Sequence, residues 1–192
     1  MYAIRRFMAA VTLVVMFSSP TFATQFVVFP KASGLASPNG RFEVRNTEAG
    51  GSPMEFVGTF HSLWLVELGN GRSRKLCDYM GVAAIAWVGN DSLVVTQYVG
   101  KKTSRALVFS VAQADDPVLL DKTTLVRLVP VELRQTLRDN EHVFVEASRI
   151  EDNTLYLHVW GYGQHAASGF RWHCKYAMQA DTISCTADDS SR

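Results

Sequence analysis

The sequence has little cysteine, little net charge and no long hydrophobic run. Three cysteines in 192 residues are too few for a scaffold held together mainly by disulfides. A formal net charge of +1 supplies neither the basic field that attracts nucleic acid nor an acidic tail. We therefore predict no nucleic-acid partner. The chain is nevertheless too apolar, at 47% hydrophobic residues, to be intrinsically disordered.

The sequence also lacks the short motifs that mark common active sites. It contains no Cys-x-x-Cys, His-Glu-x-x-His, His-x-His or Gly-x-Ser-x-Gly motif, and no phosphate-binding glycine-rich loop. Its acidic residues are dispersed, and Asp115 and Asp116 are expected to lie in a solvated loop. We therefore predict no catalytic residue, no metal ligand and no cofactor.

Residues 1–23 have the three parts of a secretory signal peptide. Arg5 and Arg6 form a basic start, and an apolar run of 11 residues begins at Phe7. Cleavage is predicted after Ala23, which leaves 169 residues with 17 basic and 18 acidic side chains. The alternative is an uncleaved membrane anchor, for which the run is short of the ~20 residues required. The mature protein is expected to be periplasmic or secreted, with no membrane span.

Short strand-forming segments separated by turn residues dominate the remaining chain. Strands are predicted at Arg41–Asn46, Leu63–Leu68, Ser73–Asp78, Ala84–Val88, Leu93–Tyr98, Arg105–Val111, His142–Ala147, Thr154–Trp160, Phe170–Met178 and Thr182–Cys185. One short helix is predicted at Pro130–Arg138, because proline suits a first helical position. Thr24–Ala36 and Ala187–Arg192 are expected to be loose ends. Residues 24–192 should therefore form a single all-β domain.

The turns indicate antiparallel hairpin repeats. In Ser37-Pro38-Asn39-Gly40, proline presets φ, asparagine bonds locally and glycine takes the left-handed conformation. A similar turn follows about fifty residues later at Gly89-Asn90-Asp91-Ser92, and a fainter third copy occurs at Glu151-Asp152-Asn153. Periods of 40–50 residues are typical of propeller blades. The fold is thus expected to be propeller-like, with about three blade-like units, or a β-sandwich.

Three segments carry a resemblance to a known family. They are Ser37-Pro38-Asn39-Gly40-Arg41-Phe42, the stretch from Leu63 to Gly71, and Ile85-Ala86-Trp87. Together they resemble the blade pattern of TolB-type, WD40-like periplasmic β-propellers, over about residues 35–111. The resemblance implies a binding scaffold and carries no catalytic residues. Propellers close with about four to eight blades, so three units imply either a sandwich or an open fragment that pairs through its sheet edges into an oligomer. The alternative is that these are ordinary hairpin turns of an unrelated β protein.

Two cysteines near the C-terminus flank a predicted hairpin. If its turn centres on Gln179-Ala180, Cys174 and Cys185 lie directly opposite each other, at a separation that suits a disulfide. We predict this bridge, and the alternative is two unpaired buried thiols. Cys77 is then the odd cysteine, and we interpret it as a buried structural residue. The alternative is a reactive thiol.

The stretch from Trp160 to Phe170 interleaves glycines with aromatic residues. Such loops on a rigid sheet concentrate binding residues, so we predict a contact surface made of Trp160, Tyr162, His165 and Phe170. The alternative is a hairpin whose aromatic residues cover the edge of the core. The leading hypothesis is therefore an exported, non-enzymatic binding module with a protein partner.

Four histidines within 32 residues suggest a rival function. Alternation places His158 with Tyr156 and Trp160 on one strand face, and His142 is expected to neighbour His158 across a hairpin. If these two converged with His165 and His173, the protein could be a small exported hydrolase or a metal-binding protein. Scattered surface histidines are the more common outcome.

Overall fold

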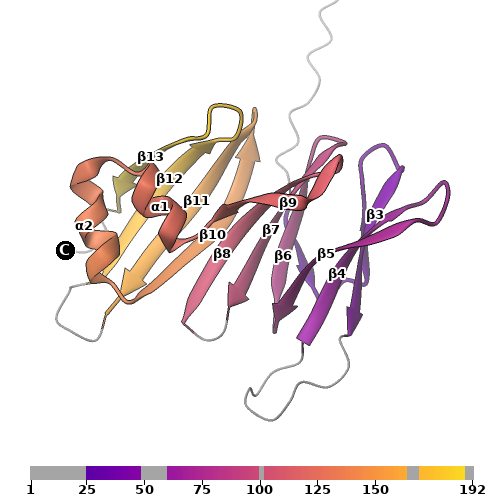
Figure 1. Ribbon diagram of the computed structural model, residues 1–192, viewed down its shortest axis with the longest axis horizontal. Helices are drawn as coiled ribbons and strands as arrows, with labels where there is room; N and C mark the ends of the chain where they lie inside the picture. The colour runs from indigo at the N-terminus through magenta and orange to yellow at the C-terminus, as the bar shows by residue number, and fades with distance from the viewer. Residues whose placement is uncertain (1–24, 49–59, 100–101, 164–168, 189–192) are drawn as a thin grey trace, which may run out of the picture.

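The computed structural model describes residues 25–48, 60–99, 102–163 and 169–188. Within these ranges the chain forms three antiparallel β-sheets and two short helices (Figure 1). The all-β class predicted from the sequence is therefore confirmed. The predicted signal peptide, residues 1–23, lies outside the described residues. In the part of the chain that is described, no helix is both long and apolar enough to cross a membrane.

The N-terminal sheet contains the predicted Ser-Pro-Asn-Gly turn between its first two strands. Its strands, in spatial order, are β2 (Gly34–Ala36), β3 (Phe42–Glu48), β4 (Phe60–Glu67) and β5 (Ser73–Met80). Between β2 and β3, the amide of Gly40 donates to the carbonyl of Ser37 at 2.9 Å. Oδ1 of Asn39 accepts hydrogen bonds from the Ser37 hydroxyl and the Arg41 amide. Gly40 has a φ of 66°, so each residue plays the part that its chemistry predicts.

The middle sheet is buried on both faces. Its strands, in spatial order, are β1 (Val27–Phe29), β6 (Ala83–Val88), β7 (Ser92–Val99), β8 (Thr103–Ser110) and β9 (Gln113–Leu120). Because successive strand residues point to opposite faces, Val94 and Ala106 pack toward the C-terminal sheet, whereas Val95 and Leu107 pack toward the N-terminal sheet.

The C-terminal sheet follows two helices. The helices are α1 (Lys122–Leu128) and α2 (Val131–Asp139), and the strands, in spatial order, are β10 (His142–Glu151), β11 (Thr154–Tyr162), β12 (Phe170–Ala177) and β13 (Thr182–Ala187). α2 confirms the predicted helix. Leu125 of α1 and Leu137 of α2 are fully buried and join the core under this sheet.

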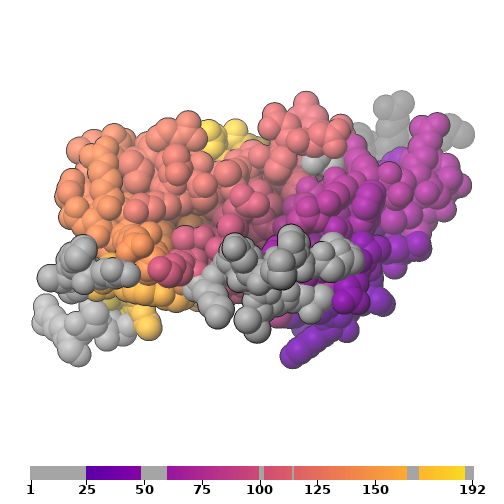
Figure 2. Space-filling view, turned by 60° about the horizontal axis from the view of Figure 1, so that its bottom comes forward, coloured from indigo at the N-terminus to yellow at the C-terminus, as the bar shows by residue number. Residues whose placement is uncertain are grey.

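The three sheets lie side by side in chain order, with the middle sheet between the other two (Figure 1). Figure 2 shows the same order as a run from indigo through magenta to orange and yellow across the molecule. The described residues bury one apolar cluster on each face of the middle sheet. Consequently one face of the N-terminal sheet and one face of the C-terminal sheet are left outside both clusters.

Four elements differ from the predictions. The expected loose end Thr24–Ala36 contributes β1 and β2, and Phe29 of β1 is fully buried. The expected loop around Asp115 and Asp116 is β9, an edge strand, where Pro117 can be accommodated without a ladder hydrogen bond. α1 is a second helix that the sequence pattern does not predict, because its threonines and valine favour strands.

Candidate functional site

One face of the C-terminal sheet lies outside the packed core, and we call it the outer face. It carries Phe144 and Glu146 of β10, Tyr156, His158, Trp160 and Tyr162 of β11, and Arg171, His173 and Lys175 of β12. The pleat sends the intervening residues inward, and Leu157, Cys174 and Tyr176 are accordingly buried. The alternation predicted for β11 is therefore confirmed, and β12 alternates in the same way.

Three aromatic rings run along β10 and β11 on the outer face, and we call them the aromatic stack. Phe144 and Trp160 lie opposite each other in the ladder, with ring centroids 3.8 Å apart and planes inclined by 6°. Tyr162 continues the stack at 6.0 Å from Phe144. Phe144 is buried by these contacts, whereas Tyr162 remains 44% exposed. Trp160 and Tyr162 are the members of the stack that present aromatic surface to solvent.

Basic side chains flank the aromatic stack. Arg171 of β12 lies directly opposite Trp160 in the ladder and is exposed. Further along the sheet, the guanidinium of Arg149 lies 4.0 Å from the ring centroid of Tyr156, and the ammonium of Lys175 lies 5.6 Å from it. Cations over an aromatic face are attracted by the ring quadrupole. The outer face thus combines aromatic contact area with positive charge.

A pair of histidines occupies the centre of the outer face. His158 and His173 are ladder partners, and their ring centroids are 4.9 Å apart. His173 Nε2 lies 3.6 Å from a carboxylate oxygen of Asp188. The predicted pairing of His142 with His158 is wrong, because the β10–β11 register places His142 opposite Tyr162. Among the described residues, no group of three or more His, Cys, Asp or Glu side chains is arranged to hold a metal ion.

Two shallow hollows meet at this histidine pair. One, of about 390 Å³, extends from His158 and His173 past Trp160 and Arg171. The other, of about 330 Å³, extends in the opposite direction past Tyr156. The outer face is therefore grooved rather than flat, and both hollows are lined by the residues that carry its charge and aromatic area.

The predicted contact surface is only partly assembled. Trp160 and Tyr162 lie together on the outer face, with ring centroids 6.2 Å apart. Phe170 lies on the opposite side of the sheet, where it contacts Trp172 and the core. This placement follows from the even spacing of Phe170 and Trp172 along β12. His165 lies outside the described residues. Arg171 and His173 belong to the same surface, and the alternation of β12 was the signal for them.

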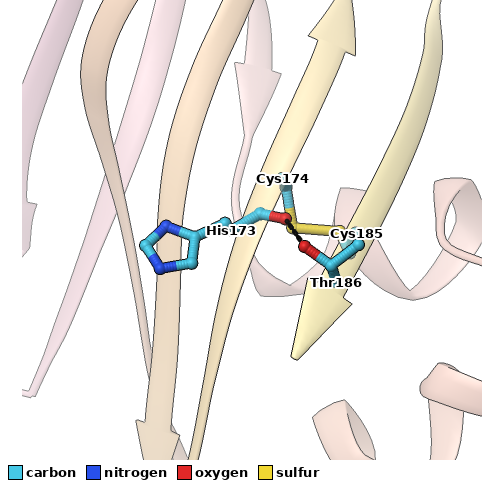
Figure 3. Close-up of a disulfide and its surroundings, with 4 residues drawn as sticks. All are labelled: His173, Cys174, Cys185 and Thr186. Atoms are coloured by element: carbon cyan, nitrogen blue, oxygen red, sulfur yellow. Dashed lines mark hydrogen bonds between the residues drawn. A yellow bond between two sulfur atoms is a disulfide. The ribbon is translucent and has the colours of Figure 1, made fainter. Parts of the chain in front are cut away.

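A disulfide joins β12 to the edge strand β13 behind the outer face. Cys174 and Cys185 are bonded, as predicted, and lie directly opposite each other in the β12–β13 ladder (Figure 3). His173 and Cys174 leave β12 in opposite directions, and the hydroxyl of Thr186 donates to the carbonyl of His173 at 3.4 Å. The disulfide therefore supports the outer face without occupying it, and it is compatible with an oxidising environment.

A hydrogen bond from the middle sheet fixes β10, the strand at the other edge of the outer face. The hydroxyl of Tyr98 on β7 donates to Glu146 of β10 at 2.6 Å. Burial, and then this hydrogen bond to a carboxylate, raise the pKa of Tyr98 to about 12.

The third cysteine lies elsewhere: Cys77 of β5 keeps a free thiol, and burial raises its pKa to about 12. A thiol with so high a pKa is a poor nucleophile, consistent with the structural role predicted for Cys77.

No protein-family model matches the chain, and neither a curated protein nor a solved structure matches it.

Proposed function

We propose that this chain is an exported binding module that holds a protein partner against the outer face of its C-terminal sheet. One observation carries the proposal: Trp160, Tyr162 and Arg171 lie beside one another on a rigid sheet whose other face is packed. Trp, Tyr and Arg are the residue types that dominate binding energy at protein interfaces. A hydrogen-bonded sheet holds them in place, which reduces the entropy cost of binding.

Export is the second part of the proposal. The basic, apolar and small-residue segments of residues 1–23 support it, as does the Cys174–Cys185 disulfide. Mass spectrometry of the protein recovered from its native producer should show a mature chain that begins at Thr24. A chain that retains residues 1–23 would contradict secretory processing.

The arrangement of the sheets supports a propeller-like scaffold. Three meandering antiparallel sheets packed face to face are what an arc of three blades would present. We therefore propose that the TolB-type resemblance reflects a shared blade architecture. Light scattering would show whether the mature chain is a monomer or an oligomer that pairs through its outer strands.

Photo-cross-linking in the producing cell tests the partner proposal. A benzoylphenylalanine at Tyr162 should form one discrete adduct with another protein, because that ring is exposed beside Trp160. The matched control is the same residue at Val131, which is 72% exposed on α2 and outside the outer face. No adduct at position 162, or the same adduct at both positions, would contradict the proposal.

Charge reversal provides a second test on the same adduct. Arg171→Glu should lower its yield by about tenfold or more, the effect expected from loss of one hot-spot side chain. Arg41→Glu changes an exposed arginine near the N-terminal sheet by the same charge and should leave the yield unchanged. Equal losses in the two variants would indicate general electrostatic attraction rather than a defined surface.

A further inference from the structure

A further hollow lies between the N-terminal and middle sheets, and we call it the inter-sheet pocket. Its volume of about 430 Å³ falls in the range of small-molecule binding sites. Phe60 and Met80 of the N-terminal sheet and Val99 of β7 line it, together with Tyr79 and Tyr98. These walls are mainly apolar. Arg105 of β8 brings a positive charge into the same space.

A buried amide positions this arginine. Gln97 of β7 is only 1% exposed. In the orientation that satisfies both ends of its side chain, its oxygen accepts from Nε and Nη2 of Arg105 at 2.6 and 2.7 Å. Its nitrogen donates to the backbone carbonyl of Asp78 at 2.7 Å. Gln97 therefore ties Arg105 to the edge of β5, and the guanidinium is held in place before any ligand arrives.

The described part of the chain offers no acidic side chain that neutralises Arg105. Asp78 also lines the pocket, but its carboxylate accepts from the Ser62 hydroxyl at 2.6 Å and from the Lys75 ammonium at 2.7 Å. A guanidinium has five N–H donors, and Gln97 engages two of those on Arg105. The remaining donors include a two-nitrogen fork of the kind that binds a carboxylate.

We propose that the inter-sheet pocket binds a small amphiphile with one anionic head, of the chemical class of a medium-chain fatty acid. The carboxylate is held by the free fork of Arg105, and the apolar body lies against Phe60, Met80 and Val99. A partly buried, fixed guanidinium favours an anion, while the apolar walls disfavour a small hydrophilic one. The site shares no hot-spot residue with the outer face, so the two proposals stand or fall separately.

Calorimetric titration of the purified full chain tests the proposal, with laurate and the uncharged dodecanol as probes below their aggregation limits. Laurate is expected to bind at one site per chain and at least about tenfold more tightly than dodecanol, because a charge-assisted hydrogen bond is lost with the alcohol. Arg105→Met should remove this preference by weakening laurate alone. Arg105→Lys should retain only part of it, because lysine keeps the charge and loses the fork.

Two further variants locate the site. Val99 is 46% exposed at the rim, so Val99→Trp should block both probes while it leaves the contact between Gln97 and Arg105 intact. Arg171→Met, on the outer face, should change neither affinity. Equal binding of laurate and dodecanol to the wild type, loss of laurate binding in Arg171→Met but not in the Arg105 variants, or several sites unaffected by Val99→Trp would each overturn the proposal.

Discussion

Ser104 of β8 satisfies both backbone groups of Val145 on β10. Its hydroxyl accepts from the Val145 amide at 2.9 Å and donates to the Val145 carbonyl at 3.2 Å. β10 is an edge strand of its sheet, so these groups face away from β11. The hydroxyl oxygen of Thr96 on β7 likewise accepts from the Ala147 amide at 3.0 Å. Side chains of the middle sheet thus take the place of a missing strand, and an exposed edge becomes a sealed junction.

Ser104→Ala should destabilise the protein, because it leaves a buried amide and a buried carbonyl without partners. The expected loss is about 2 kcal/mol in the free energy of unfolding, measured by urea denaturation. Ser148→Ala is the matched control, since its hydroxyl donates to the Tyr156 carbonyl at an exposed position. That variant should lose less than about 0.5 kcal/mol. Similar losses in the two variants would show that the junction does not depend on the Ser104 hydroxyl.

Gly161 is required for close packing of β11. A Cβ at this position would lie 2.6 Å from Cε1 of Phe170 and 2.7 Å from the backbone oxygen of His142. Gly161→Ala should therefore cost about 1–3 kcal/mol of stability in chemical denaturation, because the neighbouring backbone cannot yield freely. At Gly69 a Cβ would meet nothing within 4 Å, so Gly69→Ala should be close to neutral. A neutral Gly161→Ala would mean that β10 and β12 shift more easily than their ladders suggest.

Most strands of this fold could be predicted from local chemistry, whereas their assembly could not. Turn residues such as Asn39 and Gly40 act through their own backbone, so their role is visible in a few residues of sequence. β1 is three residues long and pairs with β6, more than fifty positions away, so no local pattern marks it. β9 begins with polar residues because it lies on an edge. The packing of three sheets in series depends on such long-range contacts.

In the candidate site, too, the local pattern predicts the face on which a residue lies but not the residues that it contacts across strands. Strand alternation puts Trp160 and Tyr162 on one face and Phe170 on the other, because Phe170 is in phase with the buried Trp172. Which residues meet across strands depends on register instead. The β10–β11 ladder shifts between Ala147 and Arg149, an irregularity that strand patterns do not reveal. The contact between His158 and His173 likewise required the β11–β12 register.

Loss of the Cys174–Cys185 disulfide should lower the free energy of unfolding by about 3 kcal/mol. This is the contribution expected when a loop with a sequence separation of 11 restricts the entropy of the unfolded chain. Thermal denaturation with and without a reductant measures the effect. Cys77→Ala is the control, because the free thiol takes no part in the bridge, and reduction should lower its melting temperature as it does in the wild type. If reduction leaves the wild-type melting temperature unchanged, the bridge makes no such contribution.

Alkaline pH should weaken the junction between Tyr98 and Glu146. Burial, and next the hydrogen bond to Glu146, raise the pKa of Tyr98 to about 12, above its usual value near 10. The unfolded chain therefore releases this proton first, so the stability that the protonated phenol contributes is complete below pH 10 and is lost as pH rises toward 12. Denaturation midpoints between pH 9 and 12 should fall less steeply in Tyr98→Phe than in the wild type. Ultraviolet titration should show one fewer late-ionising phenol in that variant. Tyr79 and Tyr176, whose pKa values burial also raises, should still ionise late. In Glu146→Gln the pKa of Tyr98 should fall only part of the way to its usual value, because burial is the larger cause and remains. A full return to the usual value in Glu146→Gln would instead assign the shift to the carboxylate.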